Sequence, residues 1–346
     1  MLIKEIYEKL PQPLKTQHTW RYSEYSYFVK DESPTTQITL SSNLNLVEKE
    51  IFEPITINYP EKITVYNYMY HTDKFATEIV KNGVYNLSIL FSGKYNLTRG
   101  QIKIAPNLEI DLVLNLYDNT NQTTTNNVIE ILVQDNSKVR ILFDHSFHNS
   151  YAHNFVYLRM MDNSDVRMVF SSFNPKYEKT HIRSLIDGLN SNFVVYILAK
   201  VDATQHVDYR TENIHLKSSS KSLSVYRSIA DGRSRSIYTG MLRIEKDAKY
   251  CNAYQNSRNI LLSDKAKVET IPELEILNQE VACTHGAVVS SIDEEAIYYF
   301  MSRGVSREEA VKLITEGFLL DKLEENLQNN LYPIIYKKVT GEEYHE

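Results

Sequence analysis

Two stretches of sequence that repeat each other decide the fold. Asn127–Phe143 reads NVIEILVQDNSKVRILF, and Asn154–Phe170 reads NFVYLRMMDNSDVRMVF. Seven of the 17 aligned positions are identical, including an Asp-Asn-Ser turn and the Val-Arg pair that follows it, and the turns at Asp135 and Asp162 are 27 residues apart. Such a period is typical of repeat architectures, in which one unit cannot bury its apolar face alone.

The same signals continue on both sides of this repeat. From about residue 102 to residue 282, apolar or aromatic stretches alternate with polar turns, and helical periodicity is almost absent. That absence argues against a helical solenoid, and a single Trp argues against a propeller. The pattern favours a parallel β-helix of stacked coils with two or three strands each. An antiparallel sandwich with a chance repeat remains the alternative.

The region before the repeats, residues 1–75, is expected to be irregular or helical. Its first ten residues place Leu2, Ile6 and Leu10 on one face of a short amphipathic helix. Pro34 and Pro54 make long helices improbable further on. We expect the β-helix core to occupy residues 76–290.

Helical periodicity returns in residues 291–346. Ser291 to Glu294 and Ser306 to Glu309 each have the pattern of a capping box, which predicts two adjacent helices. Gly304 and Gly317 are expected to end them.

Composition and charge exclude several classes of protein. The 346 residues are 42% hydrophobic and 24% charged, which is ordinary for a globular chain. A net charge of −6 argues against a nucleic-acid or anionic-membrane partner. No stretch approaches the roughly 18 apolar residues of a membrane span, and two cysteines are too few for a disulfide framework. These features predict a cytoplasmic protein without membrane or nucleic-acid partners.

The segment Cys283-Thr284-His285 is the candidate for metal chemistry. Residues two apart in a strand point to the same face, so the thiol and the imidazole are expected side by side. Thiolate and imidazole suit iron, zinc or an iron–sulfur cluster. One such pair supplies two ligands, so a closed site needs others from elsewhere in the chain or from another chain. The alternative is a buried cysteine beside a hydrogen-bonded histidine.

Three other residues carry weaker signals. Cys251 is expected to be a small core residue. His145 and His148 either form a metal pair or, as we favour, lie in a solvated turn.

Several motifs of the chain resemble the SufB/SufD family of iron–sulfur cluster assembly proteins. The resemblance is specific over about Tyr226–Leu320 and reappears weakly at Thr19–Tyr22. The matching segments are Arg258–Ala266, Pro272–Ile276, Cys283–Ala287, Asp293–Ala296, Ser302–Val305 and Glu316–Phe318. Two positions favour the SufD branch: Thr284–Val288 replaces the Glu-His-Glu-Ala-Thr element of SufB, and Asn256 replaces a SufB cysteine.

The resemblance implies a fold and a role. It implies a right-handed parallel β-helix in a SufB–SufD heterodimer, which docks the ABC-type ATPase SufC through C-terminal helices. It implies that His285, with Cys283 beside it, contributes to iron or a transient iron–sulfur cluster shared with SufB, and that none is stably bound to the isolated chain. Arg303, Glu308 and Glu309 are expected to contact SufC.

On this reading the chain is a scaffold and not an enzyme, and in isolation it is a possible homodimer. A SufB-like scaffold, a structural β-helix homodimer and, less favoured, a polysaccharide-active β-helix enzyme are the alternatives.

Overall fold

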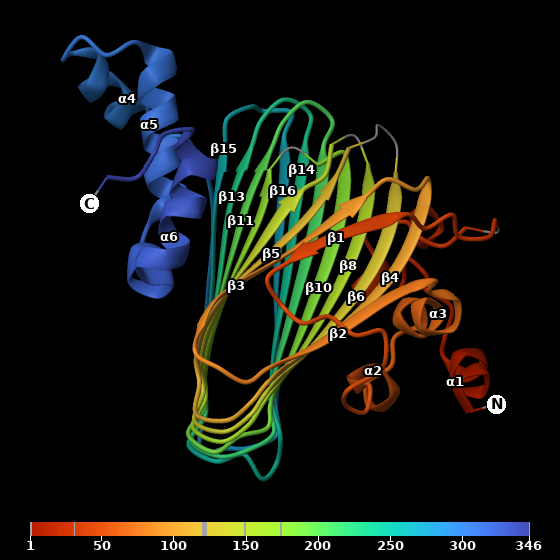
Figure 1. Cartoon of the computed structure of the whole chain (residues 1–346). Helices are drawn as coiled ribbons and strands as arrows, with labels where there is room; N and C mark the ends of the chain where they lie inside the picture. The colour runs from red at the N-terminus through yellow and green to blue at the C-terminus, as the bar shows by residue number, and fades with distance from the viewer. Residues whose placement is uncertain (1, 31, 120–122, 149, 174, 346) are drawn as a thin grey trace.

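A parallel β-solenoid of about seven turns forms the body of the computed structural model (Figure 1). The structure describes residues 2–30, 32–119, 123–148, 150–173 and 175–345, so residues 1 and 346 of the predicted terminal regions lie outside it. Within these residues the strands form two sheets, of nine and eight strands, and each turn adds one strand to each sheet. The prediction of a parallel β-helix is confirmed, and the antiparallel sandwich is excluded.

The solenoid strands alternate between the two sheets, and most are nine or ten residues long. Odd-numbered strands lie in the nine-stranded sheet and even-numbered strands in the eight-stranded sheet. Their bounds are β2 (Asp73–Ile79), β3 (Gly83–Phe91), β4 (Tyr95–Ile104), β5 (Glu109–Asp118), β6 (Thr124–Val133), β7 (Lys138–Ser146), β8 (Tyr151–Met160), β9 (Asp165–Phe173), β10 (Tyr177–Ile186), β11 (Asn192–Val201), β12 (His206–His215), β13 (Lys221–Ala230), β14 (Arg235–Ile244), β15 (Asn252–Leu261), β16 (Lys267–Ile276) and β17 (Ala282–Ser291).

The repeated Asp-Asn-Ser turn has a structural cause. Asn107, Asn136, Asn163 and Asn190 occupy equivalent turns with φ between 54° and 63°, a left-handed conformation that asparagine tolerates better than most residues. Their side-chain amides form a ladder along the stack, with Asn136 donating to Asn107 at 3.1 Å and Asn163 donating to Asn136 at 3.2 Å. The 27-residue spacing from Asn136 to Asn163 and from Asn163 to Asn190 is therefore the length of one coil, whereas the coil from Asn107 to Asn136 has 29 residues.

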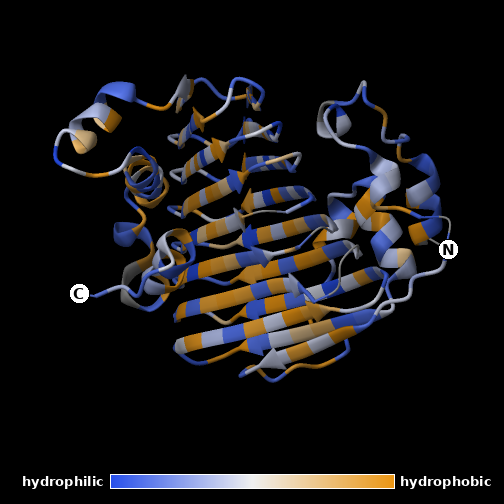
Figure 2. Cartoon of the chain, turned by 90° about the horizontal axis from the view of Figure 1, so that it is seen from above, coloured by the Kyte–Doolittle hydropathy of each residue, from blue (hydrophilic) through white to orange (hydrophobic). Residues whose placement is uncertain are grey.

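Apolar side chains fill the space between the two sheets, which we call the lumen. Successive coils place like residues above one another, as Phe143 and Phe170 do with stacked rings 4.3 Å apart. The terminal regions pack on the outer faces, on opposite sides of the stack (Figure 2).

The N-terminal region contains short helices and one strand. The helices are α1 (Leu2–Lys9), η1 (His18–Trp20), η2 (Tyr25–Tyr27), α2 (Ile55–Asn58) and α3 (Lys62–Tyr70). The strand β1 (Ile38–Ser42), which the sequence analysis did not predict, pairs antiparallel with β3, and Val47 bridges to Ala76 on β2. The first coil of the solenoid is thus covered along parts of both sheet edges.

Three helices follow the last coil: α4 (Glu294–Met301), α5 (Arg307–Leu320) and α6 (Glu324–Thr340). The helix α6 lies on the outer face of the nine-stranded sheet, where Leu327, Leu331 and Ile335 are buried against strand residues such as Leu142 and Leu198. The helix α4 and the start of α5 project to one side of the solenoid (Figure 1), whereas Leu319 near the end of α5 is buried in the same cluster.

Two details of the predicted helix boundaries were wrong. Ser291 ends β17, and Asp293 caps α4 by accepting from the backbone N–H groups of Glu295 and Ala296. Gly317 does not end α5, which continues to Leu320, whereas Gly304 follows α4 with a φ of 87°. Gly317 has no left-handed φ, so it continues the helix like any other residue.

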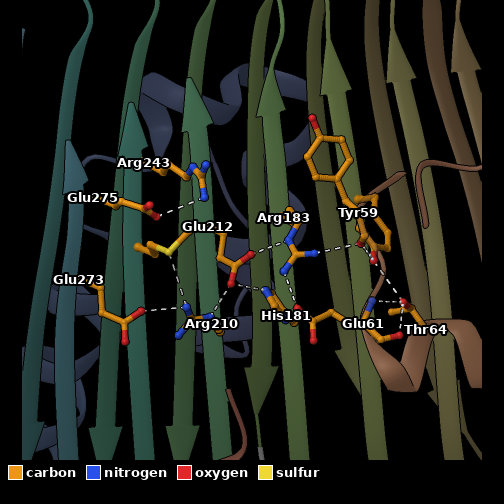
Figure 3. Close-up of polar contacts among 12 residues, drawn as sticks. Tyr59, Glu61, Thr64, His181, Arg183, Arg210, Glu212, Arg243, Glu273 and Glu275 are labelled. Carbon is orange, nitrogen blue, oxygen red and sulfur yellow. Dashed lines mark hydrogen bonds and ion pairs between the residues drawn. The ribbon is translucent and has the colours of Figure 1, made fainter. Parts of the chain in front are cut away.

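A network of buried charges fixes the N-terminal region to the outer face of the eight-stranded sheet (Figure 3). Glu212 accepts from Arg183 at 2.5 Å and from Arg210 at 2.7 Å. Arg183 also donates to the carbonyl of Tyr59 and to Glu61, both in the segment that joins α2 to α3. This contact borders a groove of about 490 Å³. Because its arginines already pair with carboxylates, we assign the network a structural role.

Candidate functional site

The C-terminal end of the solenoid is open. In the described part of the chain, β17 pairs with β15 alone and β16 pairs with β14 alone, so each presents one unpaired edge. Unpaired edges carry backbone N–H and C=O groups that another strand can satisfy. This end therefore has the chemistry of a docking edge.

Cys283 and His285 lie on β17 at this open end. Their register partners on β15 are Ala253 and Gln255, which are buried on the lumen face of that strand. Cys283 and His285 therefore belong to the lumen face of the last coil, as the alternation of side chains along a strand requires. No further coil covers them, so His285 is exposed and Cys283 is half-buried.

The thiol of Cys283 is held in its neutral form. Burial against a cluster that includes Leu242 and Ala253 raises the pKa of Cys283 above its usual value. Metal binding to this thiol must therefore release a proton.

The last coil also exposes several apolar residues, which we call the apolar rim. Leu274, Ile276 and Val289 are each more than a third exposed, and Leu277 and Val288 are about half exposed. Exposed apolar residues gathered at one end of a protein mark a contact surface. The imidazole of His285 thus lies at a surface and not deep within the chain.

The pair is incomplete as a metal site within the residues the structure describes. Among them, no three His, Cys, Asp or Glu side chains lie together as a metal site requires. Cys251 does not complete it, because that residue is buried, with its Sγ 3.3 Å from Ser220 Oγ. The prediction that Cys251 is a core residue is confirmed.

Both interpretations of the His145 and His148 pair were wrong for His145. His145 lies on β7 and is buried, with its Nδ1 2.6 Å from Glu178 Oε1, whereas His148 is exposed beyond the strand. The alternation Phe143, His145, Phe147 in the sequence indicates one inward face, and the structure places His145 on it.

The predicted SufC-contact residues are exposed, Glu308 and Glu309 on α5 and Arg303 in the turn between α4 and α5. Glu308 and Glu309 occupy the first turn of α5, and Arg303 lies over the ring of Tyr299 at 4.3 Å. Tyr298, on α4, is 73% exposed. An exposed aromatic and charged surface of this kind suits a protein partner.

In the described part of the chain, no helix is both long enough and apolar enough to cross a membrane.

Comparison with known proteins gives a consistent result. Residues 91–318 match the family model described as "SUF system FeS cluster assembly, SufBD core domain". SufD of Escherichia coli is 26% identical over 202 residues, which is 57% of this chain and 48% of that protein. SufD of Bacillus subtilis is 31% identical over 157 residues (44% and 36%), and its SufB is 27% identical over 194 residues (56% and 42%).

The matched regions thus span less than half of each of these three relatives. The family match itself covers about two thirds of the chain, including β17 and the open end of the solenoid. The chain belongs to the SufBD family of iron–sulfur cluster assembly proteins.

Proposed function

We propose that the chain is a SufD-type scaffold subunit that supports iron acquisition and assembly of nascent iron–sulfur clusters. It acts without catalytic activity of its own, in the cytoplasm, with a SufB-like subunit and the ATPase SufC. The observation that carries this proposal is the open end of the solenoid, where Cys283 and His285 lie between two unpaired sheet edges.

The open end suits a SufB-like partner. Strands of the partner can pair with the edges of β16 and β17, and the apolar rim can be buried at the same time. Iron or a cluster enters as the substrate, held by His285 and Cys283 on this side and by partner ligands on the other. A site divided between two chains is easier to empty than a site closed within one.

The C-terminal helices suit the ATPase. The helix α4 and the start of α5 project to one side of the solenoid, with Glu308 and Glu309 exposed on α5 and Arg303 exposed in the turn between the helices. The helix α6 is packed on the nine-stranded sheet, so movement of α4 and α5 by a docked ATPase can be transmitted to the solenoid.

The test is anaerobic reconstitution with Fe²⁺ and sulfide, with and without the SufB-like partner, followed by absorption spectroscopy. The wild-type pair is expected to build a cluster, and a pair with His285→Ala is expected to assemble but to build far less. His148→Ala is the matched control, because that imidazole is exposed but remote from the open end. Normal cluster formation with His285→Ala would refute the assigned role.

Docking of the ATPase is tested by co-purification. Glu308→Ala with Glu309→Ala is expected to weaken capture of SufC and to leave capture of the SufB-like subunit unchanged. A chain that pairs only with itself would instead support the structural homodimer.

A further inference from the structure

Gln255 on β15 is a buried residue whose side-chain amide has no hydrogen-bond partner. Its side chain is 2% exposed, and neither Nε2 nor Oε1 is paired among the residues described. The side chain crosses the lumen to the opposite sheet, where a Cβ on Gly240 would come within 2.1 Å of Oε1. The glycine therefore provides the space that the amide occupies.

An unpaired buried amide is unfavourable, because two donors and an acceptor have lost their water. A methionine would fill the same space without that cost. The neighbouring lumen amide, Asn259, behaves differently, since it bonds both Ser228 and Ser257. The unpaired side-chain amide of Gln255 therefore indicates a hydrogen-bond partner that the amide gains only when the protein binds another component.

His285 is the neighbour of Gln255 along the axis of the solenoid. The two residues are register partners, and both lie on the lumen side of their strands. Register partners in this solenoid reach one another with polar side chains, as do Thr98 with Asn127 at 2.6 Å, Asn127 with Asn154 at 2.9 Å and Ser228 with Asn259 at 2.7 Å. The spacing of the coils thus permits a hydrogen bond between Gln255 and His285.

We propose that Gln255 is a positioning residue for His285. Its Oε1 accepts a hydrogen bond from one ring N–H, so that the other ring nitrogen is the unprotonated one and is directed toward the open end. A histidine binds a metal through an unprotonated nitrogen, and an acceptor on the other nitrogen fixes the tautomer and the ring orientation. Within the described chain the imidazole of His285 has no hydrogen-bond partner, so no other group competes with Gln255 for it.

This inference rests on the proposed function, because it assigns a role to Gln255 in metal binding by His285. Docking of a partner over the open end removes water from the exposed ring. The hydrogen bond to Gln255 is then the interaction that replaces it, and the same bond satisfies the acceptor of the buried amide.

The test compares two variants and a control in the complex with the SufB-like partner. Gln255→Met keeps the length of the side chain and removes the amide, whereas Gln255→Glu keeps an acceptor. Thr270→Val is the control, an isosteric change at the last coil. The measurements are Fe²⁺ affinity under anaerobic conditions and the imidazole nitrogen shifts of His285 with ¹⁵N-labelled histidine and Zn²⁺ as a diamagnetic probe.

Gln255→Met is expected to lower Fe²⁺ affinity roughly 10- to 100-fold. It should also allow the imidazole of His285 to populate its second tautomer. The Tm of the isolated chain is expected to stay the same or to rise. Gln255→Glu and Thr270→Val are expected to bind Fe²⁺ like the wild type.

If Gln255→Met changes neither the Fe²⁺ affinity nor the tautomer of His285, the inference is overturned. A fall in the Tm of Gln255→Met would also overturn it, because the fall would show that the amide of Gln255 is already hydrogen-bonded in the isolated chain. If His285→Ala itself leaves Fe²⁺ binding unchanged, the proposed function fails. If His285→Ala abolishes binding and Gln255→Met does not change it, only this inference fails.

Discussion

Removing the charge of Glu212 tests how the N-terminal region is held on the solenoid. Glu212 is 3% exposed and forms ion pairs with Arg183 and Arg210. Arg183 also donates hydrogen bonds to the carbonyl of Tyr59 and to Glu61 in the N-terminal region (Figure 3). Glu212→Gln leaves two buried guanidinium groups facing a neutral amide. Breaking a buried ion pair from one side costs about 3–5 kcal/mol, so we expect a loss of stability in that range.

Glu275→Gln is the matched control on the same groove. Glu275 and its partner Arg243 are substantially exposed and lie 3.3 Å apart, so the expected cost is below about 1 kcal/mol. The assay is urea unfolding followed by far-UV circular dichroism and by the fluorescence of Trp20. That single tryptophan is buried, and Lys179 on β10 lies over its ring, so its emission reports release of the N-terminal region.

The stability that Glu212→Gln loses relative to the wild type must depend on pH in one direction. Burial alone would raise the pKa of Glu212, but His181 and the two arginines hold it well below its usual value. A carboxyl whose folded pKa is depressed stabilises the fold above its unfolded pKa, about 4.3, and loses that contribution as pH falls through the folded value. The difference between wild type and Glu212→Gln should therefore be constant above about pH 5.5 and shrink in acid. A difference below about 1 kcal/mol at pH 7, or an equal loss for Glu275→Gln, would refute the reasoning.

Three further predictions follow from the turns, the C-terminal helix and the open end. Asn163→Ala should destabilise the chain by about 1–2 kcal/mol, because alanine is strained at a φ of 54°, while Asn163→Gly should cost less; thermal melts that rank the two variants in reverse would contradict the turn geometry. Leu327→Ala should cost about 2–5 kcal/mol and speed amide hydrogen exchange in α6, because Leu327 is buried against the nine-stranded sheet; unchanged exchange would place α6 off the sheet. Cys283 should react with iodoacetamide more slowly at pH 8 than a free cysteine peptide and gain rate as pH rises, because burial raises its pKa; a rate equal to that of the peptide would exclude the raised pKa.

The repeat and its turns were predictable because they are local. The left-handed φ at Asn136 and Asn163 requires a residue that tolerates it, and that requirement is visible in the sequence. The regular period also predicts that the coils stack on one another, because each coil must present the same apolar residues to the next coil. The position of Cys283 and His285 on one face of a strand followed from strand alternation alone.

Other features depend on contacts that are distant in sequence. The strand β1 is short and mixed in composition, and it exists because β3 offers it an edge. His145 is buried because Glu178, 33 residues later, accepts its hydrogen bond. The unpaired amide of Gln255 depends on Gly240 across the lumen. Such pairings carry no periodic signal, so the sequence alone does not reveal them.

The unequal ends of the solenoid also control how many subunits can join. A stack with two bare ends would add copies in both directions and grow into a fibre. Here β1 and the bridge at Val47 occupy the first coil, and the last coil is left bare. If copies join end to end through bare edges, the partly covered first coil therefore disfavours growth beyond two subunits, and β1 acts as a stop on further addition.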